Sequence, residues 1–336
     1  MTQKLLITGI CGQTGSFLAK HMLEAGYEVH GTSRSAGMMS WRHSYLGIQG
    51  EIALHSVASD NYDAVKDLVS RKFEKIFHLA AESSVAASFK HPSQTVQANI
   101  LHTTHWLEAL RNIAPKTRFF NAASSEIFAP AKGQLSESSP SQATNPYAVT
   151  KLAAANMAKI FRDSFEIYVV NGVLFNHESE LRDDRFVTAK IVNSIRALAQ
   201  NASEPAVKLG NISAQRDFSY AGDVARGIAA SLDHHSPEDY IFASGQLHSI
   251  QDFFDATARY FGFSPRWHGE GLGAVCTDTS SGRTLASISK EFFRPIDEIG
   301  KSGNPQKAKD ILGWRPEHDF ESIIKQMAKY GGLQRT

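Results

Sequence analysis

The chain has 336 residues and carries 35 Lys and Arg against 34 Asp and Glu, a formal net charge of +1 at pH 7. No run of like charges stands out, so composition gives no electrostatic support for nucleic acid or a membrane surface as a partner. Single cores tend to split above roughly 250–300 residues, so we expect one large domain and a smaller cap.

Cysteine content and the N-terminus indicate the compartment. Cys11 and Cys276 are the only cysteines, and they show neither a pairing pattern nor metal-ligand spacing. We therefore expect no metal site and a reducing environment. No apolar run is long enough to span a bilayer, and the first residues pass directly into a strand pattern, so we expect a cytoplasmic protein.

The first element is a short apolar strand, Lys4–Thr8, followed by glycines at positions 9, 12 and 15 and then by an amphipathic helix. Gly9, Gly12 and Gly15 let the backbone approach a pyrophosphate, and the helix N-terminus points N–H groups at it. This order predicts a dinucleotide site. The alternative is a tight turn without a ligand.

The end of the second strand, over residues 27–31, indicates which nicotinamide cofactor is bound. An acidic residue there would bind a ribose 2′-hydroxyl, whereas an arginine would meet a 2′-phosphate. This strand is followed by Thr32, Ser33 and Arg34, with Arg42 further on. NADP is favoured and NAD stays possible, since Arg34 could be an ordinary solvated loop residue.

Strands and helices then alternate, with strands over 52–54, 75–79 and 118–122 and helices over 62–71 and 104–110. This alternation predicts an α/β fold with a Rossmann-type, doubly wound parallel sheet, whose ligand lies at the carboxyl ends of the strands. Ser124 follows such an end. The later third of the chain is less regular, and its stretch 271–283, rich in Gly, Ser and Thr, is expected to be a loop or a disordered excursion.

Tyr147 and Lys151 stand four residues apart at the start of an expected helix. This spacing puts the phenol and the ammonium on one face, where the cation can lower the phenol pKa and prepare it for proton transfer. An ordinary surface pair has the same spacing. Ser124 and the glycine turn, converging on the same crevice, favour the functional interpretation.

Two sets of motifs carry a resemblance to known families. The chain resembles the extended short-chain dehydrogenases/reductases in four motifs: Thr8-Gly9-x-x-Gly12-x-x-Gly15, His78-Leu79-Ala80-Ala81, Ser124 and Tyr147-x-x-x-Lys151. Within them, the chain is similar to the GDP-mannose 4,6-dehydratases in Val173–Ser179, Phe186–Lys190, Leu209–Asn211, Arg216-Asp217, Phe292–Pro295 and the block from Asn304-Pro305 to Trp314.

The resemblance implies which residues form the site. Its cofactor-binding residues would be Gly9, Gly12, Gln13, Gly15, Arg34, Leu79, Ala80, Ala81, Tyr147 and Lys151. Its GDP-sugar-binding residues would be Ser83, Asn176, Lys190, Arg216, Arg294 and Asp297, because two phosphates need several fixed cations and donors. It also implies a homodimer or homotetramer. We expect an NADP-binding domain over 1–173, rejoined by 217–243, and a substrate-binding C-terminal α/β cap over 174–216 and 244–336.

The chemistry of a 4,6-dehydratase fits four residues. Tyr147 would take the proton of a sugar C4 hydroxyl, with Ser124 bonded to the same oxygen and Lys151 holding the charge. The C4 ketone acidifies the C5 proton, which Glu126 would remove before helping the C6 hydroxyl leave as water. Glu126 thus separates dehydration from simple oxidation, although it could instead cap a backbone N–H in its loop.

Several positions depart from the family pattern. Val57-Ala58 replaces a Gly-Asp pair that touches adenine, Thr14 replaces Asp, Phe128-Ala129 replaces Tyr-Gly, Asp297 stands near an expected Glu, and the run 142–146 looks more like reductases and epimerases. A different hexose or a heptose is therefore an alternative substrate. A GDP-sugar reductase, epimerase or 4-dehydrogenase is the alternative enzyme, and a catalytically silent dinucleotide sensor is the alternative outside catalysis.

Overall fold

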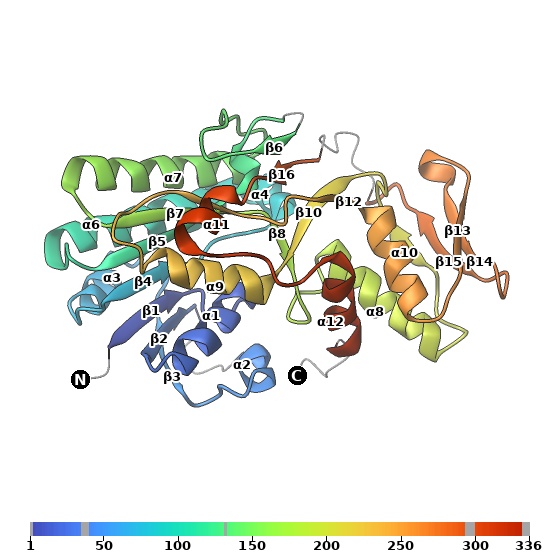
Figure 1. Cartoon of the computed structure of the whole chain (residues 1–336), viewed down its shortest axis with the longest axis horizontal. Coiled ribbons are helices and arrows are strands. Elements are labelled where there is room, and N and C mark those ends of the chain that lie inside the picture. Colours follow the sequence, from blue (N-terminus) through green and yellow to red (C-terminus); the bar gives the residue numbers. More distant parts are fainter. Residues whose placement is uncertain (1–2, 35–39, 131–132, 293–299, 331–336) are drawn as a thin grey trace.

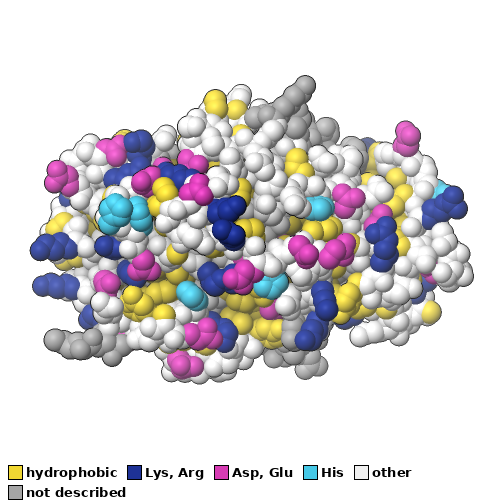
Figure 2. Space-filling model, viewed as in Figure 1, with side chains coloured by type: hydrophobic (Ala, Val, Ile, Leu, Met, Phe, Trp, Pro, Cys, Tyr) yellow, Lys and Arg dark blue, Asp and Glu magenta, His cyan; other side chains and the backbone are white. Residues whose placement is uncertain are grey.

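The computed structural model describes residues 3–34, 40–130, 133–292 and 300–330 (Figure 1). Within these ranges no helix is both long and apolar enough to cross a membrane. On the face drawn in Figure 2, basic and acidic side chains are interspersed, as the balanced composition predicts.

The centre of the fold is a parallel sheet of seven strands in the order β11-β7-β5-β4-β1-β2-β3. The strands are β1 Lys4–Thr8, β2 Glu28–Ser33, β3 Ile52–Ser56, β4 Lys75–His78, β5 Arg118–Ser124, β7 Val169–Leu174 and β11 Tyr240–Phe242. The chain proceeds outward from β1 in one direction and then, from β4, in the other. This reversal opens a crevice between β1 and β4, which is where such sheets bind ligands. The predicted doubly wound sheet is confirmed.

Helices cover both faces of this sheet (Figure 1). One face carries α1 Gln13–Glu24, α2 Trp41–Tyr45, α9 Ala221–Ser231 and α11 Gln306–Leu312. The other carries α3 Tyr62–Val69, α4 Val85–Lys90, α5 Pro92–Val96, the π-helix η1 Gln97–Leu101, α6 His102–Ile113 and α7 Pro146–Phe165.

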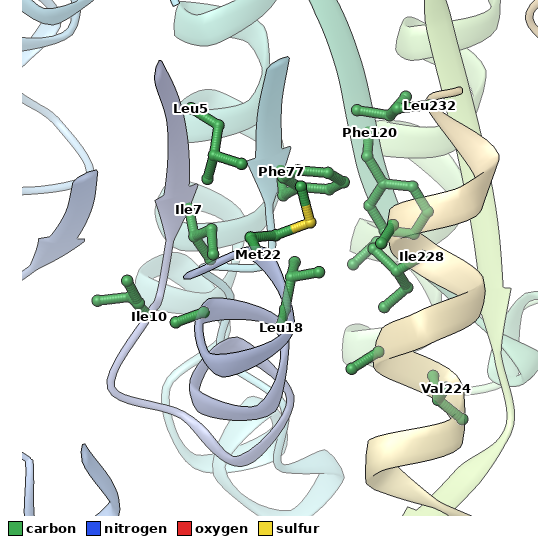
Figure 3. Close-up of a cluster of buried hydrophobic side chains, with 14 of the residues drawn as sticks. Leu5, Ile7, Ile10, Leu18, Met22, Phe77, Phe120, Val224, Ile228 and Leu232 are labelled. Atoms are coloured by element: carbon green, nitrogen blue, oxygen red, sulfur yellow. The ribbon is translucent and has the colours of Figure 1, made fainter. Parts of the chain in front are cut away.

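Alternate residues of β1 enter the two hydrophobic cores. Leu5 and Ile7 pack with helices α1 and α9, as Figure 3 shows, whereas Leu6 joins the core under α3 and α6. All three side chains are fully buried. A strand buried on both faces reads as a continuous apolar run, which is the pattern that the sequence has here.

The smaller C-terminal part is built from mixed sheets. One has the order β12-β10-β8 and another β13-β14-β15-β9, with strands β8 Asn176–Glu178, β9 Val207–Leu209, β10 Gln215–Tyr220, β12 Leu247–Ser249, β13 Pro265–His268, β14 Val275–Asp278 and β15 Thr284–Ile288. They share a core with α8 Val187–Gln200, α10 Ile250–Tyr260 and α12 Phe320–Tyr330. Short elements complete the chain: β6 Gln134–Leu135 paired with β16 Ser302–Gly303, and the 3₁₀ turns η2 Ser125–Ile127 and η3 Gly271–Gly273.

The stretch 271–283 is therefore not a plain loop, because β14 lies within it. Its Cys276 is fully buried, and its neighbours on β14 pair with β13 on one side and β15 on the other. Pairing with the neighbouring strands thus stabilises a strand in this segment, although its Gly, Ser and Thr content indicates a loop.

Candidate active site

The glycine turn packs tightly against the segment that follows β4. Gly9 has φ +68°, and a Cβ placed on it would lie 2.9 Å from the backbone N of Ala80. A Cβ on Gly15 would lie 2.6 Å from the Gly9 carbonyl oxygen, and Gly12 N donates to that same oxygen at 2.9 Å. Only glycine fits positions 9 and 15. The turn leads into α1, whose first N–H groups have no partner within the helix and so suit a pyrophosphate.

The end of β1 is fastened to the end of β4 by one hydroxyl. Thr8 Oγ1 accepts hydrogen bonds from the backbone N of Leu79 at 3.1 Å and of Ala80 at 3.0 Å. It also lies 2.9 Å from Nδ1 of His78, whose burial holds its pKa well below the usual value. The predicted cofactor residues after β4 are thereby held beside Gly9.

The side chain of Gln13, predicted to bind the cofactor, forms hydrogen bonds within the protein. Its Nε2 donates to the His177 carbonyl at 2.9 Å, and its Oε1 accepts from the Ser179 hydroxyl at 2.7 Å. Next to it, Thr14 Oγ1 lies 2.8 Å from His177 Nε2. Burial lowers the pKa of His177 to about 4, so this ring is neutral at pH 7. These hydrogen bonds therefore join the start of α1 to β8. The two segments are more than 160 residues apart, so the sequence pattern does not indicate this contact.

Two further predicted residues lie at the surface. Arg34 is exposed directly after β2, and Ser83 is exposed between β4 and α4. Arg42, in contrast, holds backbone together: its Nε donates to the Leu181 carbonyl at 2.8 Å and its Nη1 to the Cys11 carbonyl at 3.3 Å.

The four predicted catalytic residues converge at the carboxyl end of β5. Ser124 is the last residue of β5, and its Oγ accepts from the backbone N of Glu126 at 3.3 Å. Tyr147 and Lys151 lie on the first turns of α7, and the Ser124 hydroxyl is near enough to the Tyr147 phenol to lower its pKa. Lys151 Nζ donates to the Ala122 carbonyl at 2.6 Å.

Helix α7 begins where the sequence predicts it. Pro146 occupies the first turn, and Asn145 Oδ1 caps the helix by accepting from Ala148 N at 2.9 Å. The backbone N of Tyr147 donates to Ser88 Oγ at 3.1 Å. The phenol is thus fixed by contacts at the helix start.

Burial controls the electrostatics of the Tyr147 and Lys151 pair. It raises the pKa of Tyr147 to about 12, with the Glu126 carboxylate adding to the rise and the Ser124 hydroxyl opposing it. It lowers the pKa of Lys151 to about 8. The expectation that Lys151 lowers the phenol pKa is therefore wrong for the protein alone: burial dominates, and the cation that opposes the rise is Arg182.

This depressed pKa makes stability depend on pH. Below about pH 8 Lys151 is charged in both the folded and the unfolded protein, and the folded protein is destabilised by the burial of this charge. Between about pH 8 and its unfolded value of 10.5 only the unfolded state holds the proton, so stability rises with pH. The free energy of unfolding of wild type, relative to Lys151→Met, should increase by about 3 kcal/mol from pH 7 to pH 11. Urea titrations of cofactor-free protein check this, and a constant difference would contradict it.

Asn99 is a buried residue that sequence reasoning missed. It lies in the π-helix η1, where its Oδ1 accepts from Glu82 N at 2.8 Å and its Nδ2 donates to Thr150 Oγ1 at 2.9 Å. Thr150 Oγ1 in turn donates to the Tyr147 carbonyl at 2.8 Å. Asn99 thus joins the loop after β4 to the helix that carries the phenol. The one sign of this role in the sequence is a polar residue at a position where the helical pattern predicts burial.

Glu126 lies beside the phenol with a partly exposed carboxylate. Its side chain is 29% exposed, its Oε2 accepts from Asn145 Nδ2 at 3.4 Å, and Lys301 Nζ lies 3.8 Å from that oxygen. The sequence analysis did not identify Lys301. The alternative role of Glu126, capping a loop N–H, has no hydrogen bond supporting it among those of the described ranges.

Three of the predicted sugar-nucleotide residues, Asn176, Lys190 and Arg216, lie in the C-terminal part. Asn176 on β8 pairs in register with Phe218 of the neighbouring β10, which also carries Arg216. Lys190 on α8 lies 3.6 Å from the ring centroid of Phe292, and burial lowers its pKa. Arg294 and Asp297 lie outside the described residues. Among the described residues, no cluster of three His, Cys, Asp or Glu could hold a metal.

Comparisons with known proteins identify the family of the chain. The family model described as GDP-mannose 4,6 dehydratase matches residues 6–327. The chain is 33% identical to the GDP-mannose 4,6-dehydratase of Vibrio cholerae serotype O1, covering 96% of this chain and 91% of that protein. It is 31% identical to the human GDP-mannose 4,6 dehydratase over 96% and 89% of the two chains. A relative from Sordaria araneosa named GDP-mannose 4,6-dehydratase is 36% identical, and the match covers 96% of this chain but 59% of that protein.

Solved structures support the fold. The UDP-glucose 4-epimerase of Thermotoga maritima superimposes with a TM-score of 0.81 at 17% identity, with 98% of each chain covered. A Bacillus cereus UDP-glucuronic acid 4-epimerase, solved with UDP-glucuronic acid and NAD, gives 0.80 at 20% identity and the same coverage. Taken with the family match over nearly the whole chain, this shows that the protein belongs to the GDP-mannose 4,6-dehydratase family, hydro-lyases of the extended short-chain dehydrogenases/reductases that use a nicotinamide dinucleotide.

Proposed function

We propose that the chain removes water from GDP-mannose to give a GDP-linked 4-keto-6-deoxy sugar. The observation that carries this proposal is the placement of a carboxylate, Glu126, beside Ser124 and Tyr147 at the carboxyl end of β5. A dehydrogenase needs the phenol and the hydroxyl, whereas the elimination of water also needs a base for C5.

Each residue has a proposed task. Tyr147 takes the C4 hydroxyl proton while the Ser124 hydroxyl binds the same oxygen, and the Lys151 ammonium stabilises the phenolate. Glu126 then removes the C5 proton, which the C4 ketone has acidified, and delivers a proton to the departing C6 hydroxyl. A nicotinamide dinucleotide held at the glycine turn would supply the redox chemistry, hydride uptake from C4 and hydride return to C6 with a proton added at C5, so that no oxidant is consumed.

The test is turnover without added nicotinamide. Purified protein with its retained cofactor is incubated with GDP-mannose and, separately, with UDP-glucose, and the products are examined by mass spectrometry. The proposal requires loss of one water from GDP-mannose. A product with unchanged mass would instead support an epimerase, and binding of both ligands without any product would support the silent sensor.

We further propose that the dinucleotide is NADP. The support is Arg34, exposed directly after β2, where the ribose of a dinucleotide lies in this fold. Arg34→Ala should weaken NADP binding about tenfold or more and leave NAD binding nearly unchanged, because a charge-assisted bond to a 2′-phosphate is lost. Calorimetric titration with both dinucleotides decides this, and an unchanged preference for NADP would remove Arg34 from the site.

A homodimer is proposed from the outer face of α5, η1 and α7. Val96, Leu101, Val149 and Ile160 are between 41% and 52% exposed on these helices. Exposed apolar side chains on neighbouring helices are typical of an interface, and a second copy presenting the same helices would cover them symmetrically. Light scattering after gel filtration should give twice the mass of the chain, and a monomer would contradict the proposal.

We further propose a dinucleotide-binding part over 1–173 and 217–243 and a substrate-binding part over 174–216 and 244–336. Helix α11 of the latter range packs against the large sheet, so this segment returns to the dinucleotide-binding part. The GDP-sugar would then contact Ser83, Asn176, Lys190, Arg216, Arg294 and Asp297. We also propose a cytoplasmic location, where the free cysteines Cys11 and Cys276 would stay reduced.

A further inference from the structure

A buried lysine approaches the proposed base from a distant part of the chain. Lys301 Nζ lies 3.8 Å from Glu126 Oε2, and its side chain is 7% exposed. The two residues are 175 positions apart. An ammonium is rarely buried unless it has a partner or a task, because removing it from water is costly.

The backbone around Lys301 is fixed by the fold. The next two residues form β16, which pairs in parallel with β6, and Gly303 N donates to Asp217 Oδ2 at 3.1 Å. Asp217 also accepts from Ser244 N at 2.8 Å and from Gly245 N at 2.9 Å. Lys301 therefore projects from a segment anchored to both parts of the molecule, and its charge is held in one place.

The charge of Glu126 poses an electrostatic problem that a nearby cation solves. The carboxylate contributes to the raised pKa of Tyr147, so it opposes formation of the phenolate on which C4 oxidation depends. A cation close to the carboxylate offsets the field of the carboxylate at the Tyr147 phenol. It thereby favours the phenolate, which is the form that accepts a proton.

We propose that Lys301 is a positioning residue for the acid/base step: it holds the Glu126 carboxylate oriented toward C5 of the bound sugar. This inference rests on the proposed dehydratase function and deepens it. Asn145, which contacts the same carboxylate oxygen from the start of α7, is the second element of this support.

The test compares neutral and charged replacements. Lys301→Met and Lys301→Gln should each lower kcat for GDP-mannose about 10- to 100-fold with KM changed less than about threefold, since a positioning residue supports part of the usual acid/base contribution. Lys301→Arg should recover most of the rate. Lys307→Met is the matched control: Lys307 pairs with Glu238 at 2.7 Å and donates to the Asp239 carbonyl at 2.9 Å instead of approaching Glu126, so its loss should leave turnover unchanged.

Isotope effects separate positioning from a general structural role. Substrate carrying deuterium at C5 should give a larger primary isotope effect in Lys301→Met than in wild type, because removal of that proton becomes rate-limiting. In a Glu126→Gln background, Lys301→Met should have little further effect on the remaining rate.

The outcomes are distinct. A slower Lys301→Met enzyme with an unchanged C5 isotope effect, or a Lys301→Met enzyme as fast as wild type, would overturn the inference. An additive loss in the double variant would do the same, because it would show that Lys301 acts without Glu126. Wild-type protein that dehydrates no GDP-mannose would instead refute the proposed function itself.

Discussion

Glu126→Gln should reduce dehydration of GDP-mannose by about 10²- to 10⁴-fold, the usual contribution of a general acid/base. Glutamine keeps the shape of the side chain but neither accepts the C5 proton nor donates one to the C6 hydroxyl. The backbone hydrogen bond from residue 126 to Ser124 does not depend on the side chain, so the fold of the loop should persist. Steady-state turnover, followed by NMR of the sugar, measures the loss.

The control is Glu51→Gln, a replacement at an exposed site before β3, which should leave turnover unchanged. Exchange of the C5 hydrogen with solvent gives a second readout, since it should fall together with dehydration. Dehydration at near wild-type rate in Glu126→Gln would show that another group is the base.

Tyr147→Phe should lower turnover by a similar factor of about 10²–10⁴, but at an earlier step. The phenyl ring preserves packing at a position that is 8% exposed, while the hydroxyl that takes the C4 proton is lost. No ketone then forms, so both ketone formation and C5 exchange should disappear.

The comparison with Glu126→Gln makes the assignment specific, because that variant should still be able to form the C4 ketone. Tyr260→Phe, at a residue that is 45% exposed on α10, controls for loss of a phenol elsewhere. Ketone formation at wild-type rate in Tyr147→Phe would contradict the assigned role of the phenol.

The sequence predicted the sheet because its signals are local. The apolar run of β1 ends at Gly9, and the turn that follows needs a residue with φ +68° and no Cβ. Tyr147 and Lys151 share a helix face because four residues make about one turn. Such features depend on neighbours in the chain, so a pattern of residue types suffices to predict them.

The remainder of the site depends on contacts between distant segments. Lys301 reaches Glu126, 175 positions earlier in the chain, through the β6–β16 pair, and His177 meets Thr14 through the packing of β8 on α1. The sequence contains no local sign of either contact. The direction of the Tyr147 pKa also escaped prediction, because it depends on how deeply the phenol is buried.

The most direct test of the central claim is incubation of the purified protein with GDP-mannose in deuterated water, without added nicotinamide, while the sugar is followed by NMR. We predict loss of the C6 hydroxyl, a ketone at C4 and deuterium at C5 of the product. A sugar that keeps its C6 hydroxyl, whether epimerised, reduced or left as a 4-ketone, would contradict the assignment of a 4,6-dehydratase.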